Sequence, residues 1–247
     1  EYYRENVDLM NKTGKNSLLP GIPIPDDIVI SNDVEEVIRN ATVICLVVPS
    51  HTVRNLLEQI KGKINKKTIF VNLTKGIEED TLLRISEVIH TVLEHPEDKI
   101  AALYGPSHAE EVSREVPTAI VAASKNIETA DFVQTVFMSK YLRVYSNTDI
   151  IGVEIGGSIK NVIAIASGIC DGMGLGDNTK AALITRGLME ITRMGMIMGA
   201  KEETFAGLSG VGDLIVTCNS KHSRNRYVGE EIGKGRKLQD VLDGMTM

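Results

Sequence analysis

The chain has no tryptophan and few other aromatic residues, since Trp, Tyr and Phe together make up 4% of its 247 residues. This scarcity argues against the aromatic platforms on which nucleic-acid bases stack. A basic excess is missing too, because 27 Lys and Arg residues stand against 33 Asp and Glu residues. Proteins that neutralise phosphate backbones show such an excess, so we expect no nucleic-acid partner.

Cysteine is equally scarce, and Cys45, Cys170 and Cys218 are scattered through apolar stretches. An odd number of scattered thiols is typical of a reducing compartment and not of a disulfide framework, which predicts a cytoplasmic location. Cys218 and His222 alone are too few ligands for a zinc site, and we expect no metal. The longest apolar run, near residues 42–48, is far too short to span a membrane, so no transmembrane segment is expected.

A dinucleotide fingerprint is also missing, because no G-x-G-x-x-G segment follows a predicted strand anywhere in the chain. Glycines cluster at 172–176 and 207–212, but both clusters follow helical or irregular sequence. We interpret them as tight turns between helices. The chain therefore offers no fingerprint from which cofactor binding follows.

What the chain does contain is an alternation of strand and helix patterns from residue 26 to 146. This alternation predicts an α/β fold with a doubly wound, mainly parallel, Rossmann-like sheet that is truncated in its N-terminal half. The expected strands are 28–30, 42–48, 68–73, 100–104, 118–123 and 142–145. The expected helices are 34–40, 52–60, 80–93, 109–114 and 127–138, followed by 153–171, 179–198, one from 204 onward, 224–232 and 238–242. The domains are an incomplete dinucleotide-binding domain, 1–147, and an all-α substrate domain, 148–247, incomplete at its C-terminus.

The most informative segment is 152–186, GVEIGGSIKNVIAIASGICDGMGLGDNTKAALITR. Its first half predicts a helix that is apolar on every side and therefore buried, yet Lys160 and Asn161 lie in its middle. Burial removes water from a lysine, lowers its pKa and allows it to act as a base near neutral pH. A lysine that extends along an apolar surface to reach solvent is the alternative, and the residues alone leave both open.

Three predicted strand ends carry polar residues, namely Ser50, Lys75 with Gly76, and Ser107 after Gly105. In an open parallel sheet the carboxyl ends of the strands gather at one edge, where ligands bind. Ser107 and Glu110 also match the S-x-x-E capping box. A structural capping role is the simpler interpretation for both serines, whereas Lys75 is either a residue of a binding crevice or an ordinary surface charge.

Near the carboxyl end, Ser223, Arg224 and Asn225 open a predicted helix. A helix N-terminus attracts anions, and the planar guanidinium of arginine fits two phosphate oxygens. This combination favours a phosphate or pyrophosphate contact over a solvated basic cap. Asp213, just before an apolar run, is either a turn former or a partly buried carboxylate.

Several long motifs together resemble one family: KGIE from Lys75, GPSHAEEV from Gly105, the 152–187 block, GLSGVGDLIVTC from Gly207 and SRNR from Ser223. They are similar, in this order, to bacterial-type NAD(P)-dependent glycerol-3-phosphate dehydrogenase. The resemblance implies an oxidoreductase that interconverts sn-glycerol 3-phosphate and dihydroxyacetone phosphate with NAD or NADP. It also implies a homodimer that supplies glycerophospholipid synthesis.

The resemblance further assigns roles to residues, with Lys160 as the proton acceptor. The positions that match substrate-binding residues are Lys75, Gly105, Ser107, Lys160, Asp213, Ser223, Arg224 and Asn225. The positions that match cofactor-binding residues are Lys75, Ala109 and Arg224. Two alternatives stay open: a related two-domain hydroxy-acid dehydrogenase, against which the SRNR segment argues, and a non-enzymatic metabolite-binding fragment.

The chain departs from the family pattern at its ends, because it begins at Glu1 without methionine, lacks the glycine fingerprint and stops at Met247. We therefore expect a fragment whose sheet has an exposed edge. A protein of these 247 residues alone is expected to lack dehydrogenase activity and to associate.

Overall fold

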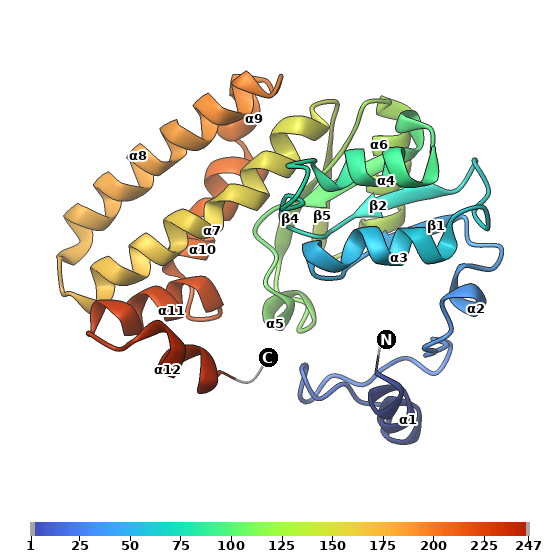
Figure 1. Ribbon diagram of the computed structural model, residues 1–247, viewed down its shortest axis with the longest axis horizontal. Coiled ribbons are helices and arrows are strands. Elements are labelled where there is room, and N and C mark those ends of the chain that lie inside the picture. Colours follow the sequence, from blue (N-terminus) through green and yellow to red (C-terminus); the bar gives the residue numbers. More distant parts are fainter. Residues whose placement is uncertain (1–2, 246–247) are drawn as a thin grey trace.

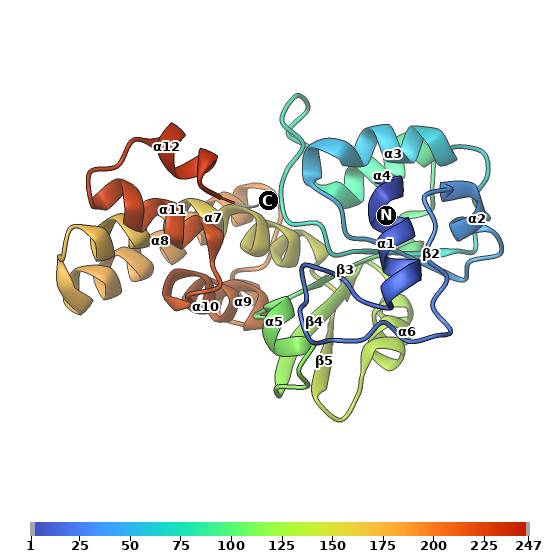
Figure 2. The same ribbon diagram turned by 90° about the horizontal axis from the view of Figure 1, so that it is seen from below.

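The computed structural model describes residues 3–245, so Glu1 and Met247, on which the fragment expectation rests, lie outside the described residues. A sheet with its helices forms one half, and a helical half lies beside it (Figures 1 and 2). The strands are β1 (Val43–Leu46), β2 (Ile69–Asn72), β3 (Ile100–Tyr104), β4 (Thr118–Ser124) and β5 (Leu142–Asn147). The helices of this half are α1 (Arg4–Thr13), α2 (Val34–Ile38), α3 (Val53–Ile60), α4 (Ile85–Leu93), α5 (Ala109–Val112) and α6 (Ile127–Phe137).

The sheet has the order β1-β2-β3-β4-β5 and is parallel except between β3 and β4. All residues of β2 and β3 are buried, as expected for central strands covered on both faces. One core lies beneath α3 and α4, and a second lies on the other face beneath α6. The predicted mainly parallel, doubly wound sheet is confirmed.

The expected strand at residues 28–30 is wrong, because this segment has no regular structure and Ile28 and Val29 are exposed. No described strand lies beside it to complete a hydrogen-bond ladder, and an extended segment without a ladder is not a strand. The same cause affects β1, which was expected to be buried on both faces. Within residues 3–245 β1 pairs with β2 alone, and Cys45 and Val47 are exposed.

Two helices also differ from expectation. The helix expected over residues 80–93 begins only at Ile85, because residues 77–84 form a turn in which Ile77 and Arg84 pair. The sequence analysis missed α1, which ends at Gly14 in the left-handed conformation that favours glycine.

The helical half is built around α7 (Ile150–Gly172), against which α8 (Gly176–Ile197) and the later helices pack. Its other elements are α9 (Glu202–Phe205), a π-helical turn η3 (Leu208–Gly212), α10 (Asp213–Asn219), α11 (Arg224–Gly233) and α12 (Leu238–Asp243). The glycine cluster at 172–176 forms the expected turn between α7 and α8, whereas the cluster at 207–212 forms η3.

α7 is long and apolar enough to cross a membrane by length and composition, and it is the one such helix among residues 3–245. However, 56% of its apolar 18-residue stretch is buried inside the protein, as in the core helix of a globular domain. Its burial is not uniform, since Val162 is 65% exposed. The expectation of an all-round buried helix holds for the half nearer the sheet, which carries Glu154 and Lys160.

α7 and α11 approach each other so closely that their backbones touch. A Cβ atom added to Gly168 would lie 1.9 Å from the carbonyl oxygen of Arg226, and one added to Gly229 would lie 2.0 Å from that of Ile165. Real Cβ atoms do not approach other atoms this closely, so only glycine fits at these two positions. This glycine seam fixes where α11 begins relative to α7.

Candidate active site

Lys160 lies on α7 where the helical half meets the sheet, and only 4% of it is exposed. Its Nζ donates a hydrogen bond to Asp213 Oδ1 and another, of 2.7 Å, to Thr217 Oγ1. Lys160 therefore does not extend to solvent, and of the two interpretations that the sequence left open, the buried lysine is the correct one. Asp213 and Thr217 lie one helical turn apart on α10, which presents both to the lysine.

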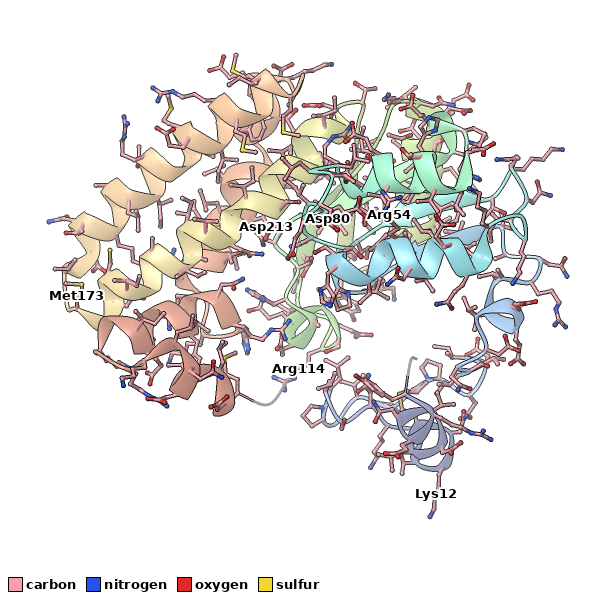
Figure 3. All side chains as sticks on the ribbon, in the orientation of Figure 1. Lys12, Arg54, Asp80, Arg114, Met173 and Asp213 are labelled. Carbon is pink, nitrogen blue, oxygen red and sulfur yellow. The ribbon has the colours of Figure 1, made fainter. Side chains whose placement is uncertain are left out.

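The backbone of α7 explains how Asp213 reaches Lys160. A Cβ atom at Gly156 would lie 2.6 Å from the carbonyl oxygen of Ser209, so this glycine lets η3 rest directly on α7. Asp213 follows η3 immediately and is itself 1% exposed. Figure 3 labels Asp213 at the junction of the two halves. The partly buried carboxylate interpretation is therefore the correct one.

Lys75 follows β2 and enters the same cluster from the sheet. Its Nζ donates to Asp213 Oδ2 at 2.8 Å and to the carbonyl oxygen of Gly105 at 3.4 Å. One carboxylate thus holds two ammonium groups, one from each half. The sequence analysis named Lys75, Lys160, Asp213 and Gly105, but not Thr217, whose only signal was its four-residue spacing from Asp213.

The electrostatics of this cluster bring the pKa of Lys160 closer to neutral pH. Burial and the nearby charge of Lys75 lower the pKa of Lys160 from 10.5 to about 8, although the Asp213 carboxylate opposes the change. Burial has the larger effect. An amine with this pKa accepts and returns a proton near neutral pH, which suits general acid–base chemistry.

The other predicted site residues lie at the start of α11 and in the segment that leads into α5. Ser223 caps α11, with its side chain accepting a hydrogen bond from the Arg226 amide, and Arg224 is exposed on the first turn beside Asn225. Arg226, by contrast, pairs with Asp171 and Glu230 within the helical half.

Ser107 and Ala109 flank His108. The ring of His108 contacts the segment that precedes α11. The imidazole rings of His108 and His222 lie 5.8 Å apart, and His222 directly precedes Ser223. The loop before α5 is linked to Lys160 indirectly, because Lys75 donates to the Gly105 carbonyl oxygen and to Asp213, which also accepts from Lys160. The capping box expected for Ser107 is wrong. His108, and not Ser107, is the residue that directly precedes α5, and Ser107 Oγ instead donates to the Gly105 carbonyl.

His108 is a residue that the sequence analysis missed. Its Nε2 is buried and has no hydrogen-bond partner among the described residues. Burial, and then the positive charge of Lys160, lowers its pKa, so the ring is neutral at pH 7. A buried polar atom without a partner is costly, so a polar group of a bound ligand fits this position.

The edge of the sheet also fits part of a nicotinamide cofactor. The carboxyl ends of β1, β2 and β3 lie at one edge, as dinucleotide sites require. Val47, just after β1, is 68% exposed and offers apolar surface for a flat ring, and Lys75 follows β2. These residues suit the nicotinamide end, whereas the pyrophosphate end has no glycine fingerprint in this sequence.

Comparison with known proteins identifies relatives of this arrangement. The family model for the N-terminus of NAD-dependent glycerol-3-phosphate dehydrogenase matches residues 1–130, and the model for its C-terminus matches residues 149–247. A glycerol-3-phosphate dehydrogenase (NAD(P)+) of Clostridium perfringens is 49% identical over 98% of this chain and 73% of its own length. One of Chlorobium phaeobacteroides is 54% identical over 93% of this chain and 69% of its own length.

A solved structure gives the same result. The crystal structure of glycerol-3-phosphate dehydrogenase from Coxiella burnetii superposes with a TM-score of 0.94 at 38% sequence identity. The match covers 99% of this chain and 75% of the other.

Proposed function

Because the chain belongs to the NAD-dependent glycerol-3-phosphate dehydrogenase family, we propose that Lys160, Asp213 and Lys75 form the proton-transfer centre of that reaction. The family interconverts sn-glycerol 3-phosphate and dihydroxyacetone phosphate with NAD(P). The observation that carries the proposal is the buried Lys160, whose pKa is lowered to about 8 between an aspartate and a second lysine.

In the oxidative direction, neutral Lys160 removes the proton from the C2 hydroxyl of glycerol 3-phosphate. In the reverse direction, its ammonium form donates a hydrogen bond to the carbonyl oxygen of dihydroxyacetone phosphate and then protonates it. Asp213 and Thr217 accept hydrogen bonds from Nζ and orient it toward the substrate. Lys75 binds substrate and cofactor where the two meet, and Gly105 and Ser107 also bind the substrate.

The phosphate of the substrate binds at the start of α11, where Ser223, Arg224 and Asn225 supply donors beside a helix N-terminus. This anchors the substrate away from the reacting carbon and orients it. When bound, NAD(P) would supply the hydride chemistry of the reaction, taking the hydride that leaves C2 of the substrate or returning it. Lys75, Ala109 and Arg224 are the residues that we propose to hold this cofactor.

The organisation around this centre is also proposed. The dinucleotide-binding domain comprises residues 1–147 and the substrate domain residues 148–247, with the centre between them. The protein acts in the cytoplasm as a homodimer, and the exposed apolar side chains of Met189, Met196 and Ile197 on α8 support a subunit interface there. Light scattering of the full-length protein tests this, and a monomer at micromolar concentration contradicts it.

Substrate preference tests the proposed function. The full-length enzyme is assayed for NADH and NADPH oxidation with dihydroxyacetone phosphate and, separately, with a 2-keto acid of similar size. The proposal expects turnover with the phosphate ester and little with the keto acid. Preference for the keto acid supports a hydroxy-acid dehydrogenase, and no turnover with either supports a binding protein.

A further inference from the structure

A chain of buried polar groups lies next to the two lysines, and the proton transfer described above does not use it. Glu154, on α7, is 1% exposed and accepts hydrogen bonds from Arg84 Nη1 at 2.6 Å and from the amide of Ser86 at 2.9 Å. Asn72, at the end of β2, donates to Glu154 Oε1 at 2.9 Å and to the hydroxyl of Tyr104 at 3.0 Å. These hydrogen bonds thus connect α7 to the end of β2.

The backbone amide and the backbone carbonyl oxygen of Thr74 are both held by this network. Asn72 Oδ1 accepts from the Thr74 amide at 2.9 Å, and the Tyr104 hydroxyl donates to the Thr74 carbonyl oxygen. Thr74 precedes Lys75, so these two bonds, together with the two between Gly76 and the Ser158 hydroxyl on the other side, fix the backbone from which the lysine extends. The ring of Tyr104 also lies 6.0 Å from Lys75 Nζ.

Tyr104 touches the helix that carries Lys160 as well. A Cβ atom at Gly157 would lie 2.6 Å from the Tyr104 ring, so the ring rests against the α7 backbone one turn before Lys160. Tyr104 is 1% exposed, and burial raises its pKa well above 10, which keeps its hydroxyl protonated and able to donate. The tyrosine thus contacts both the helix of one lysine and the backbone next to the other.

We propose that Tyr104 is a positioning residue whose hydroxyl, through the Thr74 carbonyl, holds the Lys75 ammonium at its place beside Asp213 and Lys160. Without the hydroxyl the backbone carbonyl oxygen of Thr74 loses this donor, while its amide stays bound to Asn72 and its side chain to the carbonyl oxygen of Val48, and Lys75 moves more freely. The positioning itself stands on these contacts alone, and only its kinetic consequence rests on the proposed role of Lys160 as base.

The consequence is a change in the proton affinity of Lys160. Lys75 approaches it from the sheet and lowers its pKa, Asp213 on α10 raises it, Thr217 on α10 accepts its hydrogen bond, and His108 lies near it before α5. Of these groups, only Lys75 follows directly on a residue that the Tyr104 hydroxyl binds, and Tyr104→Phe keeps the ring that packs on α7. When Lys75 moves away, the ammonium form of Lys160 loses a repulsive neighbour and its pKa rises.

The test is an NMR titration of full-length protein containing ε-13C-labelled lysine, with Lys160 assigned from the signal lost in Lys160→Arg. We expect Tyr104→Phe, which keeps the ring, to raise the pKa of Lys160 above 8 by about half a unit or more. Asn72→Ala, which frees the Thr74 amide, should shift it in the same direction. Tyr141→Phe, at an exposed tyrosine, is the matched control and should leave it unchanged.

A double-mutant cycle shows whether Tyr104 acts through Lys75. Lys75→Met should itself raise the pKa of Lys160, and Tyr104→Phe should then add nothing. An unchanged pKa in both Tyr104→Phe and Asn72→Ala, or an equal shift with and without Lys75, overturns the proposal.

The kinetic arm separates this inference from the proposed function. A base with a raised pKa is less deprotonated, so the kcat/KM of Tyr104→Phe for glycerol 3-phosphate at pH 7 should fall about 3-fold or more. A shift in the NMR titration without any shift in the pH–rate profile supports the positioning role of Tyr104. The same result contradicts the assignment of Lys160 as the base.

Discussion

Replacing Asp213 by asparagine tests the electrostatic account of the site most directly. The carboxylate contacts Lys160 through Oδ1 and Lys75 through Oδ2, and asparagine keeps the shape but removes the charge. The carboxylate favours the ammonium form of Lys160, whereas burial and Lys75 disfavour it. Without the carboxylate only the two lowering influences remain, so the pKa of Lys160 must fall below 8.

The size of the effect follows from the same contacts. An opposite charge within hydrogen-bond distance changes a pKa by about 1–3 units, so a fall of about one unit or more is expected. In the wild type, a pKa of about 8 leaves roughly a tenth of Lys160 neutral at pH 7, about 300-fold more than a pKa of 10.5 would. In the variant, about half of Lys160 or more should be neutral at that pH.

The assay is the pH dependence of kcat/KM for glycerol 3-phosphate oxidation by the full-length enzyme. With the neutral amine as the proposed base, the wild-type rate should rise with pH up to about 8 and then level off. In Asp213→Asn this rise should move to lower pH. The plateau should drop by roughly 10- to 100-fold, since both lysines lose their shared anchor.

Asp171→Asn is the matched control, because Asp171 pairs with Lys180 and Arg226 outside the lysine cluster. In Asp171→Asn, kcat/KM should still rise with pH up to about 8, as in the wild type. Titration of the substrate phosphate affects every variant alike and cancels in the comparison. If the rise stays in place in Asp213→Asn, or moves to higher pH, the carboxylate does not control the proton affinity of Lys160 and the reasoning is refuted.

Three further predictions concern the base, the phosphate site and the glycine seam. Lys160→Ala should lower kcat by about 10²- to 10⁴-fold while dihydroxyacetone phosphate still binds by calorimetry, and a change of only a few-fold would make Lys160 structural. Arg224→Lys should weaken binding of glycerol 3-phosphate by about 10-fold or more, because an ammonium cannot contact two oxygens as a guanidinium does, while the low activity with glycerol stays unchanged. Equal losses of activity toward glycerol and glycerol 3-phosphate would show that Arg224 does not bind the phosphate. Gly229→Ala should lower the free energy of unfolding, measured in denaturant, by about 1–3 kcal/mol. Gly244→Ala is the control, because its Cβ would meet only ordinary contacts, and it should change this free energy by less than about 0.5 kcal/mol. Similar values for both variants would contradict the close contact at the glycine seam.

The sequence predicted the central strands well, because β2 and β3 are buried on both faces and consist of short apolar runs bounded by turns. It failed at residues 28–30, where the apolar pattern is real but strand formation depends on a partner strand. α1 was missed for the opposite reason, since its pattern is weakly apolar and only Val7 is buried.

For the candidate site, sequence reasoning identified Lys160 from its apolar surroundings, which is information carried by neighbours along one helix. The network of Glu154, Asn72 and Tyr104 was not predicted, because its members lie on different elements and meet only through tertiary packing. His108 was missed because nothing in its neighbours signals a buried nitrogen without a partner. Contacts between distant segments have no local pattern from which they can be derived.

The glycine seam has a mechanical consequence. Where the backbones of α7 and α11 touch, neither helix can slide or rotate against the other without a steric clash. The start of α11 and Lys160 therefore travel together as one rigid body. Any hinge motion of the protein must bend at the junction between β5 and α7, where Asp149 ties α7 to Thr204 and the amide of Lys201. Opening and closing of the two halves then changes the distance from Lys75 to Lys160 but leaves constant the geometry between Lys160, the proposed base, and the start of α11, the proposed phosphate anchor.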